Sequence, residues 1–371
     1  MDLFPAVDPI PLPAPVWLFK VLHLVTMALH FPAVHFMVGG LFWIVLWQIL
    51  GRAAGNTAAK DASGVAAYRL PIVLAYVINF GVPPLLFTQV LYGRGLYTSS
   101  VLIGAYWLGV IGLLLILYAI LYWVSNRVEH RLPVLIGGLL SLALVLKIGY
   151  IYSSNMTLML RPEVWREMYR AHPSGTQLPT GDPTLLARWI YMMVGSVWLS
   201  GAFLLLLGMK SNLKSETAQL LRRHGGLALA ILTIPQIVLA YNVYRVQPGA
   251  VQQGLSGSLV YNGSALLWLL TALAVAALGA LAWKSSSTRS WVLTGGACTA
   301  GFLNVLSMVV YRDGIRDLTL GQHGYDVWNR QEYYNLPVLV LFLICFVLGV
   351  VTVAWLASVV LRAKQTEEQY V

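Results

Sequence analysis

The stretch Phe19–Trp43, FKVLHLVTMALHFPAVHFMVGGLFW, decides the fold class, because it is apolar throughout and still holds three of the seven histidines. Lys20 is the one residue of this stretch with a fixed charge. As a helix, the stretch would exceed the roughly 20 residues that cross about 30 Å of hydrocarbon. We therefore expect it to form the core of a transmembrane helix.

The composition of the whole chain agrees with a protein of the lipid bilayer. Of its 371 residues, 58% are hydrophobic and 10% are charged, and the mean hydropathy is +0.72. A soluble domain carries roughly a quarter charged residues, so too few polar side chains remain to cover a water-facing surface. The net charge of +10 would suggest nucleic acid for a soluble protein. No nucleic-acid partner is expected for a protein covered by lipid.

Nine apolar segments are long enough to cross a membrane. Lipid offers the backbone no hydrogen-bond partners, so each segment is expected to be helical. A β-barrel is excluded because the apolar runs are continuous. The sequence predicts an all-α integral membrane protein with about nine transmembrane helices in a single polytopic domain, residues 1–371. The segments lie near residues 16–50, 71–93, 100–125, 133–154, 186–209, 225–244, 259–283, 290–311 and 335–362.

The distribution of Lys and Arg predicts the orientation. Most of them lie in one set of short connections, whereas the opposite set consists mainly of two longer loops, about 155–186 and 312–334, that also carry Asp and Glu. Positive charge marks the cytoplasmic side, so the N-terminus and both long loops are expected outside and the C-terminus in the cytoplasm. The expected location is an inner (cytoplasmic) membrane of bacterial type. The residues of the cytoplasmic set are Arg52, Lys60, Arg69, Arg127, Arg131, Lys210, Lys214, Arg222, Arg223, Lys284, Arg289, Arg362 and Lys364.

The histidines of the first helix are the leading candidates for chemistry. His23 and His30 are seven residues apart, which places them on nearly the same helix face and roughly 10 Å from each other. His35 lies beyond Pro32, where a kink is expected. An ionisable group at membrane depth is costly and often functional, and a neutral imidazole can ligate haem iron. The alternative is that all three are core histidines bonded to backbone or hydroxyl groups.

Other candidates lie on other helices. A second iron ligand would come from Met192, Met193 or Met308. Lys147, in the segment 133–154, either extends to the outer interface or neutralises a haem propionate or a bound quinol.

The motif YRDGIRD, residues 311–317, holds two arginines at helical spacing. Arg312 and Arg316 either grip haem propionates or the carboxylates of a partner, or are neutralised by Asp313 and Asp317 in an ordinary surface network. The sequence leaves these two readings open.

Several reaction classes are excluded by missing motifs. There is no P-loop, GxSxG, HExxH or CxxCH pattern, so phosphoryl transfer, hydrolysis and covalent haem attachment find no support. Acidic residues are nearly absent from the apolar segments, which argues against a carboxylate proton relay and against a transporter.

The segment VTMALHFPAVHFMVGG, residues 25–40, resembles the first helix of subunit I of cytochrome bd-type quinol oxidases, a nine-helix family with an outside N-terminus. The haem-ligand histidine of that helix falls on His30. LYGRG, residues 91–95, and YTSSVLIGAYWLGVIG, residues 97–112, resemble the family's connection into its third span. The resemblance implies a haem b at His30 and a link to quinol.

Other positions of the family differ in this chain. The fifth-span haem histidine falls on Met192 or nearby, and the seventh-span methionine falls near Leu267. The eighth-span glutamate falls near Leu306 or Ser307, and the long quinol-binding loop shrinks to about 246–257. The family motif GRQPW is replaced by YRDGIRD. We therefore expect the scaffold and one cofactor, without the three-haem oxygen-reducing site.

The leading hypothesis is a membrane subunit of a respiratory electron-transfer complex. It would exchange electrons between quinol and an outer c-type cytochrome, together with other membrane subunits, and its cofactors would be one haem b and a quinone. The first alternative is a cofactor-free structural anchor of a redox complex, and the second is a transporter. Arginines and aromatic residues in the two outer loops favour a partner on that side.

Overall fold

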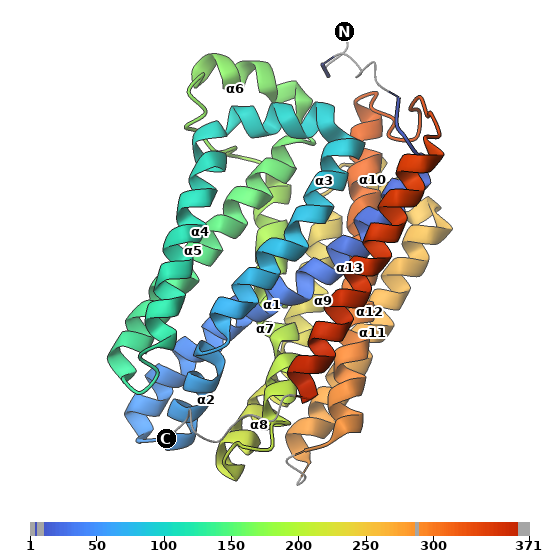
Figure 1. The fold of residues 1–371 in the computed structure, drawn as a ribbon. Coiled ribbons are helices and arrows are strands. Elements are labelled where there is room, and N and C mark those ends of the chain that lie inside the picture. Colours follow the sequence, from blue (N-terminus) through green and yellow to red (C-terminus); the bar gives the residue numbers. More distant parts are fainter. Residues whose placement is uncertain (1–3, 6–10, 286–288, 363–371) are drawn as a thin grey trace.

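The computed structural model describes residues 4–5, 11–285 and 289–362, and its helices form one bundle (Figure 1). Within the described residues there is no β-sheet, only an isolated bridge between Leu12 and Glu332. The predicted all-α class is confirmed. The elements are α1 Val16–Ala54, α2 Thr57–Ala67, α3 Leu70–Leu102, α4 Gly104–Ser125, α5 Arg131–Leu158, η1 Pro162–Val164, α6 Trp165–Ala171, α7 Pro183–Gly208, α8 Ser215–Ile231, α9 Thr233–Arg245, α10 Gly249–Gly257, α11 Leu259–Lys284, α12 Trp291–Gln322 and α13 Leu336–Arg362.

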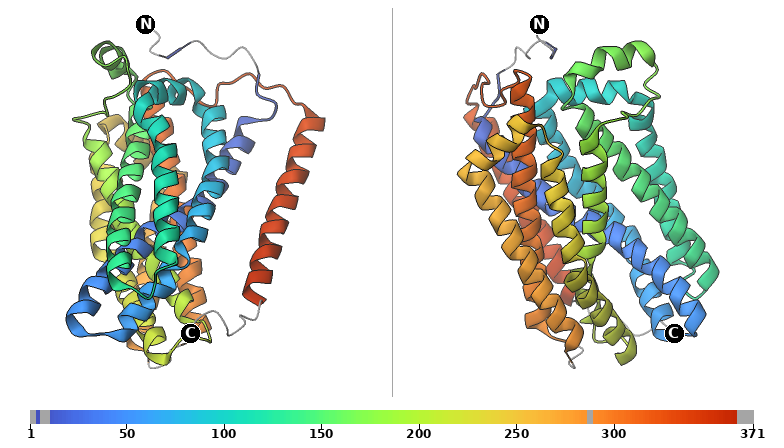
Figure 2. Two further views of the ribbon diagram at one scale, coloured as in Figure 1. Left: turned by 60° about the vertical axis from the view of Figure 1, so that its left-hand side comes forward. Right: turned by 180° about the vertical axis from the view of Figure 1, so that it is seen from behind.

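Eight stretches of helix in the described part of the chain are long and apolar enough to cross a membrane. They are α1, α2 with α3, α4, α5, α7, α8 with α9, α11 and α12. The ninth expected segment, 335–362, is the helix α13, whose part Leu336–Thr352 is apolar. In Figure 2 (left), α13 stands at the edge of the bundle.

Some predicted boundaries are wrong. α12 continues to Gln322, so residues 312–322 are helical and not part of a loop. α3 continues to Leu102 and changes direction at Tyr92, where φ is −128° and ψ is 22°. The span expected at 225–244 is divided at Leu232 into α8 and α9. Hydropathy marks where a helix is apolar, but a helix whose charged residues find partners inside the protein continues past that point.

The bundle has two ends, which we call the α6 end (top of Figure 1) and the α8 end (bottom). Both α1 and α13 begin at the α6 end. Leu12 N donates to Gln331 O at 2.8 Å, and the Glu332 carboxylate accepts from Val16 N at 2.8 Å, so it caps α1. The segments of the two expected outer loops both lie at this end (Figure 1). The N-terminus itself and the tail after Arg362, on which the expected orientation also depends, lie outside the described residues.

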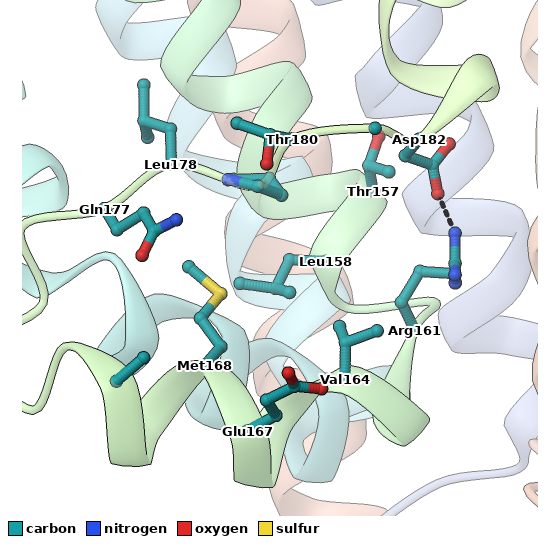
Figure 3. A pocket seen from close by; sticks show the side chains of 13 residues that line it. Thr157, Leu158, Arg161, Val164, Glu167, Met168, Gln177, Leu178, Thr180 and Asp182 are labelled. Atoms are coloured by element: carbon teal, nitrogen blue, oxygen red, sulfur yellow. Dashed lines mark hydrogen bonds and ion pairs between the residues drawn. The ribbon is translucent and has the colours of Figure 1, made fainter.

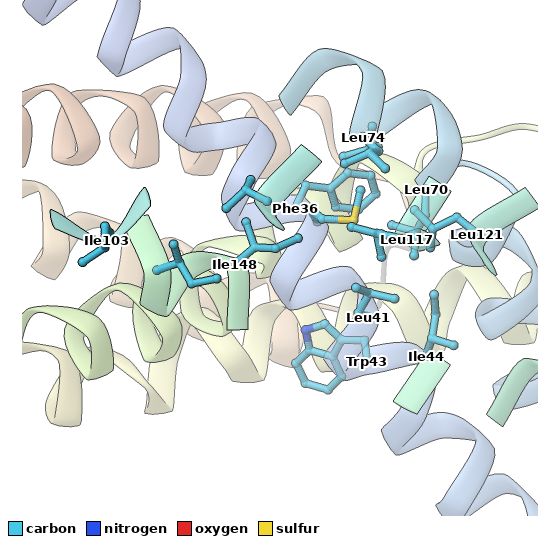
Figure 4. Packing of buried hydrophobic residues seen from close by; sticks show 14 of the residues in the cluster. Phe36, Leu41, Trp43, Ile44, Leu70, Leu74, Ile103, Leu117, Leu121 and Ile148 are labelled. Carbon is cyan, nitrogen blue, oxygen red and sulfur yellow. The ribbon is translucent and has the colours of Figure 1, made fainter. Parts of the chain in front are cut away.

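α1 is the central helix and runs obliquely through the bundle (Figures 1 and 2). It packs against α3, α5, α7 and α12 and remains one helix through Pro32. Leu41 and Ile44 of α1 are 1% exposed and belong to the main apolar core (Figure 4). The central position of α1 lets its polar face reach side chains from several other helices.

Candidate functional site

Lys20 lies in a buried polar cluster that joins α1, α3 and α12. Its Nζ donates to Tyr92 Oη at 2.6 Å, to Asp313 Oδ2 at 2.7 Å and to Asp317 Oδ1 at 2.7 Å. Tyr92 Oη lies 2.9 Å from Asp313 Oδ1 and 2.8 Å from Asp317 Oδ1, so its proton goes to one of the two carboxylates. Lys20 is 3% exposed and Tyr92 0%. The cluster therefore holds three helices together through charges that solvent does not reach.

Arg316 extends this cluster to His23. Its Nη1 lies 3.0 Å from His23 Nε2 and 3.6 Å from Asp313 Oδ1. Because a guanidinium only donates, His23 Nε2 must accept. The proton of a neutral ring then sits on Nδ1, which lies 3.2 Å from Pro84 O. Both ring nitrogens of His23 are engaged, so the geometry does not favour His23 as an iron ligand.

The expectation that Arg312 and Arg316 lie in an outer loop is wrong, because both belong to the last turns of α12. The Arg316 side chain is 4% exposed, and its acidic partner is Asp313 of the same chain. Two positive charges, Lys20 of α1 and Arg316 of α12, meet two negative ones, Asp313 and Asp317 of α12, so the bundle can bury all four. A lone lysine in an apolar span, and two aspartates four residues apart, were the sequence signals for this cluster.

His30 has a different environment from His23. Its Nδ1 is buried without a hydrogen-bond partner among the described residues. The backbone of Val77 is near the ring but makes no bond with Nδ1 that meets normal geometry. A Cβ at Gly81 of α3 would lie 2.9 Å from His30 Cε1, so the glycine makes room for the ring. A buried polar atom without a partner costs about 1–3 kcal/mol, which marks His30 as a residue with unmet bonding capacity.

His30 lines an apolar cavity of about 300 Å³, which we call the His30 cavity. The helices α1, α3, α4, α5 and α7 surround it, and α12 contributes one side chain. No carboxylate lines it. The lining residues with polar or sulfur atoms that matter below are His30, Arg188, Met192, Met193 and Arg312.

A second cavity of about 350 Å³ lies between α7, α9, α11 and α12, and we call it the aromatic cavity. No carboxylate and no histidine line it. Its ring residues are Tyr191, Tyr241, Tyr244, Trp268 and Tyr311. The two cavities share part of their walls, because Met156, Arg188, Met192 and Arg312 line both.

The two shared arginines have few partners. Arg312 makes no hydrogen bond or ion pair with any described residue, and its guanidinium lies 5.9 Å from the centre of the Phe31 ring. Arg188 Nη1 donates to Thr157 Oγ1 at 3.3 Å. A charge inside a protein normally has a counter-charge. No local signal in the sequence distinguishes Arg188 from the other arginines.

No protein-family model matches the sequence, and no curated protein matches it. The structure is similar to a chain of bd oxidase from Geobacillus thermodenitrificans, with a TM-score of 0.67 over 95% of this chain and 98% of that chain. The two chains share a fold. They are 10% identical in sequence, so the likeness concerns the arrangement of helices and not the ligands. The fold implied by the resemblance at residues 25–40 is thus confirmed.

On this bd-oxidase-like scaffold, His35 lies away from the His30 cavity. Its Nδ1 lies 2.9 Å from Ser196 Oγ, whose own proton goes to Met192 O at 2.7 Å. His35 borders a cavity of only about 10 Å³ together with Met308, which does not line the His30 cavity. His35 is therefore a bonded core histidine that helps to fix the backbone at Met192.

The structure does not bring Lys147 to the site. The residue is exposed and lines neither cavity. Its Nζ lies 5.5 Å from the centre of the Tyr106 ring and 5.9 Å from that of Tyr150. This setting agrees with the first of the two readings, a lysine that extends along the surface.

The α6 end also has a polar pocket of about 360 Å³ beneath α6 (Figure 3). Arg161 forms an ion pair there with Asp182, which also caps α7 by accepting from Thr184 N at 2.7 Å. Burial alone would raise the pKa of Asp182, but hydrogen bonds from Thr184 and the charge of Arg161 lower it below its ordinary value. The ionised Asp182 is thus committed to Arg161 and to the helix cap.

Proposed function

We propose that this chain is a membrane subunit of a respiratory electron-transfer complex and that its His30 cavity holds one haem b. The observation that carries the proposal is the His30 ring, which is buried at the wall of an apolar cavity and whose Nδ1 has no hydrogen-bond partner in normal geometry among the described residues. The fold likeness to bd oxidase supports the same reading.

The residues present fit a haem in three respects. A neutral imidazole is a common axial ligand of haem iron. Met192 and Met193 supply thioethers on the same cavity, and a thioether is a known second ligand. Arg312, which forms no ion pair with any described residue, can pair with a propionate. When bound, the haem would supply one-electron transfer.

The chain's own residues each have a defined part in this proposal. His30 offers a nitrogen lone pair, and the absence of a side chain at Gly81 makes room for the His30 ring itself. Arg312 would hold a carboxylate of the ligand at the wall of the cavity. The apolar lining excludes water, and a low dielectric strengthens the attraction between the guanidinium and a carboxylate.

We further propose that the complex exchanges electrons between quinol and a c-type cytochrome that docks at the α6 end. Exposed basic and aromatic side chains at this end support a docking surface, among them Arg166, Tyr169, Arg170 and Trp328. Arg316 is not part of that surface, because it is buried and paired.

The test is the spectrum of the purified complex. The wild type should show a b-type haem in its redox difference spectrum and in a pyridine haemochrome assay. His30→Ala and His30→Gln should both lose that absorbance, because ligation requires the imidazole nitrogen. The matched control is His130→Gln at an exposed histidine, which should keep it.

A normal spectrum in His30→Gln would decide against the haem at His30. In that case glutamine would replace a bonded core histidine at a stability cost of roughly 1–3 kcal/mol. The absence of haem b from the wild-type complex would favour the second candidate, a cofactor-free anchor subunit. That candidate is supported by the lining of the His30 cavity, which offers no second histidine.

A further inference from the structure

The aromatic cavity is the strongest feature that the proposed haem does not use. It lies on the other side of Met192 and Arg312 from the His30 cavity. It has no histidine, and its lining is aliphatic and aromatic except for Arg188, Arg312 and Arg316. Its ligand should therefore be largely apolar with a group that arginine recognises.

The charges around this cavity do not balance. Arg316 is paired with Asp313 and His23, and Lys20 takes the remaining carboxylate, Asp317. Arg312 has no hydrogen-bonding or ionic partner among the described residues.

Arg188 is the second cation without a counter-charge. Asp182, the acid nearest to it along the helix, is ion-paired with Arg161. Arg188 has no carboxylate within 4 Å among the described residues. Two cavities thus share two cations, Arg188 and Arg312, that form no ion pair with any residue that the structure describes.

The aromatic cavity also opens toward the bilayer. Tyr241 of α9 and Leu269 of α11 line it and are 63% and 38% exposed. Both belong to membrane-spanning segments, so this opening faces acyl chains. Arg188 lies in the second turn of α7, which begins at Pro183 at the α6 end, and Arg312 lies in the half of α12 that is nearer this end. An amphiphile can enter sideways and place its head at the arginines.

We propose that the aromatic cavity binds an anionic acyl amphiphile, with its head on Arg188 and its chain between α9 and α11. The recognised chemistry is an anionic oxygen group on an apolar tail, either the phosphate of an acidic phospholipid or the carboxylate of a free fatty acid. A zwitterionic head would bring its own cation toward the arginines and should bind more weakly. The site adjoins the cavity proposed to hold haem and shares a wall with it, but its head-group contact, Arg188, has no part in the haem proposal.

The test uses native mass spectrometry of the delipidated full-length protein in detergent. Phosphatidylglycerol, oleate and phosphatidylcholine are added separately at equal concentration. We expect one molecule of phosphatidylglycerol or oleate to be retained at least tenfold more strongly than phosphatidylcholine. The one that is retained identifies the source of the anion.

The variants locate the site. Arg188→Gln should lower retention about tenfold, the size expected for one charge-assisted contact, while Arg188→Lys should keep most of it. Ala265→Phe, which fills a position that lines the aromatic cavity but not the His30 cavity, should abolish retention. Arg245→Gln, at an exposed arginine that lines neither cavity, is the matched control.

The result also separates this proposal from the one on haem. His30→Ala should retain the amphiphile, and Ala265→Phe should retain haem b. Equal retention of the three amphiphiles, or equal retention by Arg188→Gln and the wild type, would overturn the proposal. Size-exclusion chromatography of each variant shows whether it is folded. If Arg188→Gln is not folded, Ala265→Phe carries the test, and retention equal to that of the wild type would overturn the proposal.

Discussion

Three ionisable residues on one face of α1 differ in their hydrogen-bond partners. Lys20 is fully paired by two carboxylates, His23 uses both ring nitrogens, and His30 leaves a nitrogen without a partner. All three are costly in an apolar span. Their pairing depends on the residues of α3 and α12 that lie opposite each of them. Lys20 and His23 therefore stabilise the fold, whereas His30 is available to a ligand.

At this scale we predict that Lys20→Met lowers the free energy of unfolding by about 3–5 kcal/mol, since it leaves a buried carboxylate without its partner. The combined variant Lys20→Met with Asp317→Asn removes one charge of each sign and should regain much of the loss. Unfolding in detergent, followed by circular dichroism, measures both. Lys147→Met, an exposed lysine without a carboxylate partner, should stay within about 0.5 kcal/mol of the wild type. Equal stability of Lys20→Met and Lys147→Met would refute a stabilising role for the cluster.

Small residues decide how closely the helices approach each other. A Cβ at Gly39 of α1 would lie 2.3 Å from Ser200 Cβ of α7, so the small Ser200 side chain occupies the space that a side chain at position 39 would need. Membrane helices pack in this way because lipid provides no hydrophobic force between them, and close contact has to supply the attraction. The approach of α7 to α1 in turn brings Arg188 and Met192 to the walls of both cavities.

We predict that Gly39→Ala destabilises the protein by about 1–3 kcal/mol, because the added methyl group forces α1 and α7 apart. Gly112→Ala on α4 is the control, since no described atom outside its own helix turn lies within 4 Å of the added group. That change should be neutral or stabilising by up to about 1 kcal/mol. Thermal unfolding of both variants gives the comparison. If Gly39→Ala were as stable as Gly112→Ala, the contact between α1 and α7 at Gly39 would have room for a methyl group.

In the molecule as a whole, the residues that could bind a ligand or a partner lie near the α6 end. The charged cluster, the shared arginines and the exposed aromatic residues all lie in that part of the bundle, whereas the opposite end holds the short basic connections. A bd-oxidase-like fold at 10% identity shows that such a bundle tolerates almost complete replacement of its residues. A core depends on the apolar character and the total volume of its side chains. The fold can therefore persist when the residues that ligate a cofactor are replaced.

The orientation of this bundle is the prediction at the scale of the whole protein. From the distribution of Lys and Arg we expect the α6 end outside and the connection near Gly55 in the cytoplasm. Ser174→Cys and Thr57→Cys test this, because both positions are exposed, in a background with Cys298→Ala and Cys345→Ala. A membrane-impermeant maleimide should label the Ser174→Cys protein in intact spheroplasts and the Thr57→Cys protein only after permeabilisation. The reverse pattern would invert the orientation.

The sequence by itself determined the membrane class, the all-α fold and the approximate helices. Each of these depends on a local property, the length of apolar runs. The boundaries at Leu102 and Gln322 were missed for the same reason, because charged residues look like the end of an apolar segment. The choice of His30 stays a prediction, and it combined the cost of an ionisable group in such a run with the resemblance at residues 25–40.

Only the tertiary structure decided which ionisable groups are paired. Lys20 and Asp313 are 293 positions apart in the chain, and their contact exists because α1 and α12 pack side by side. The same packing placed Arg188 beside Arg312 in a common wall and left Lys147 on the surface. A single sequence holds no record of which helices are neighbours. The partners of a buried charge, and with them the difference between a structural ion pair and a ligand site, follow from packing alone.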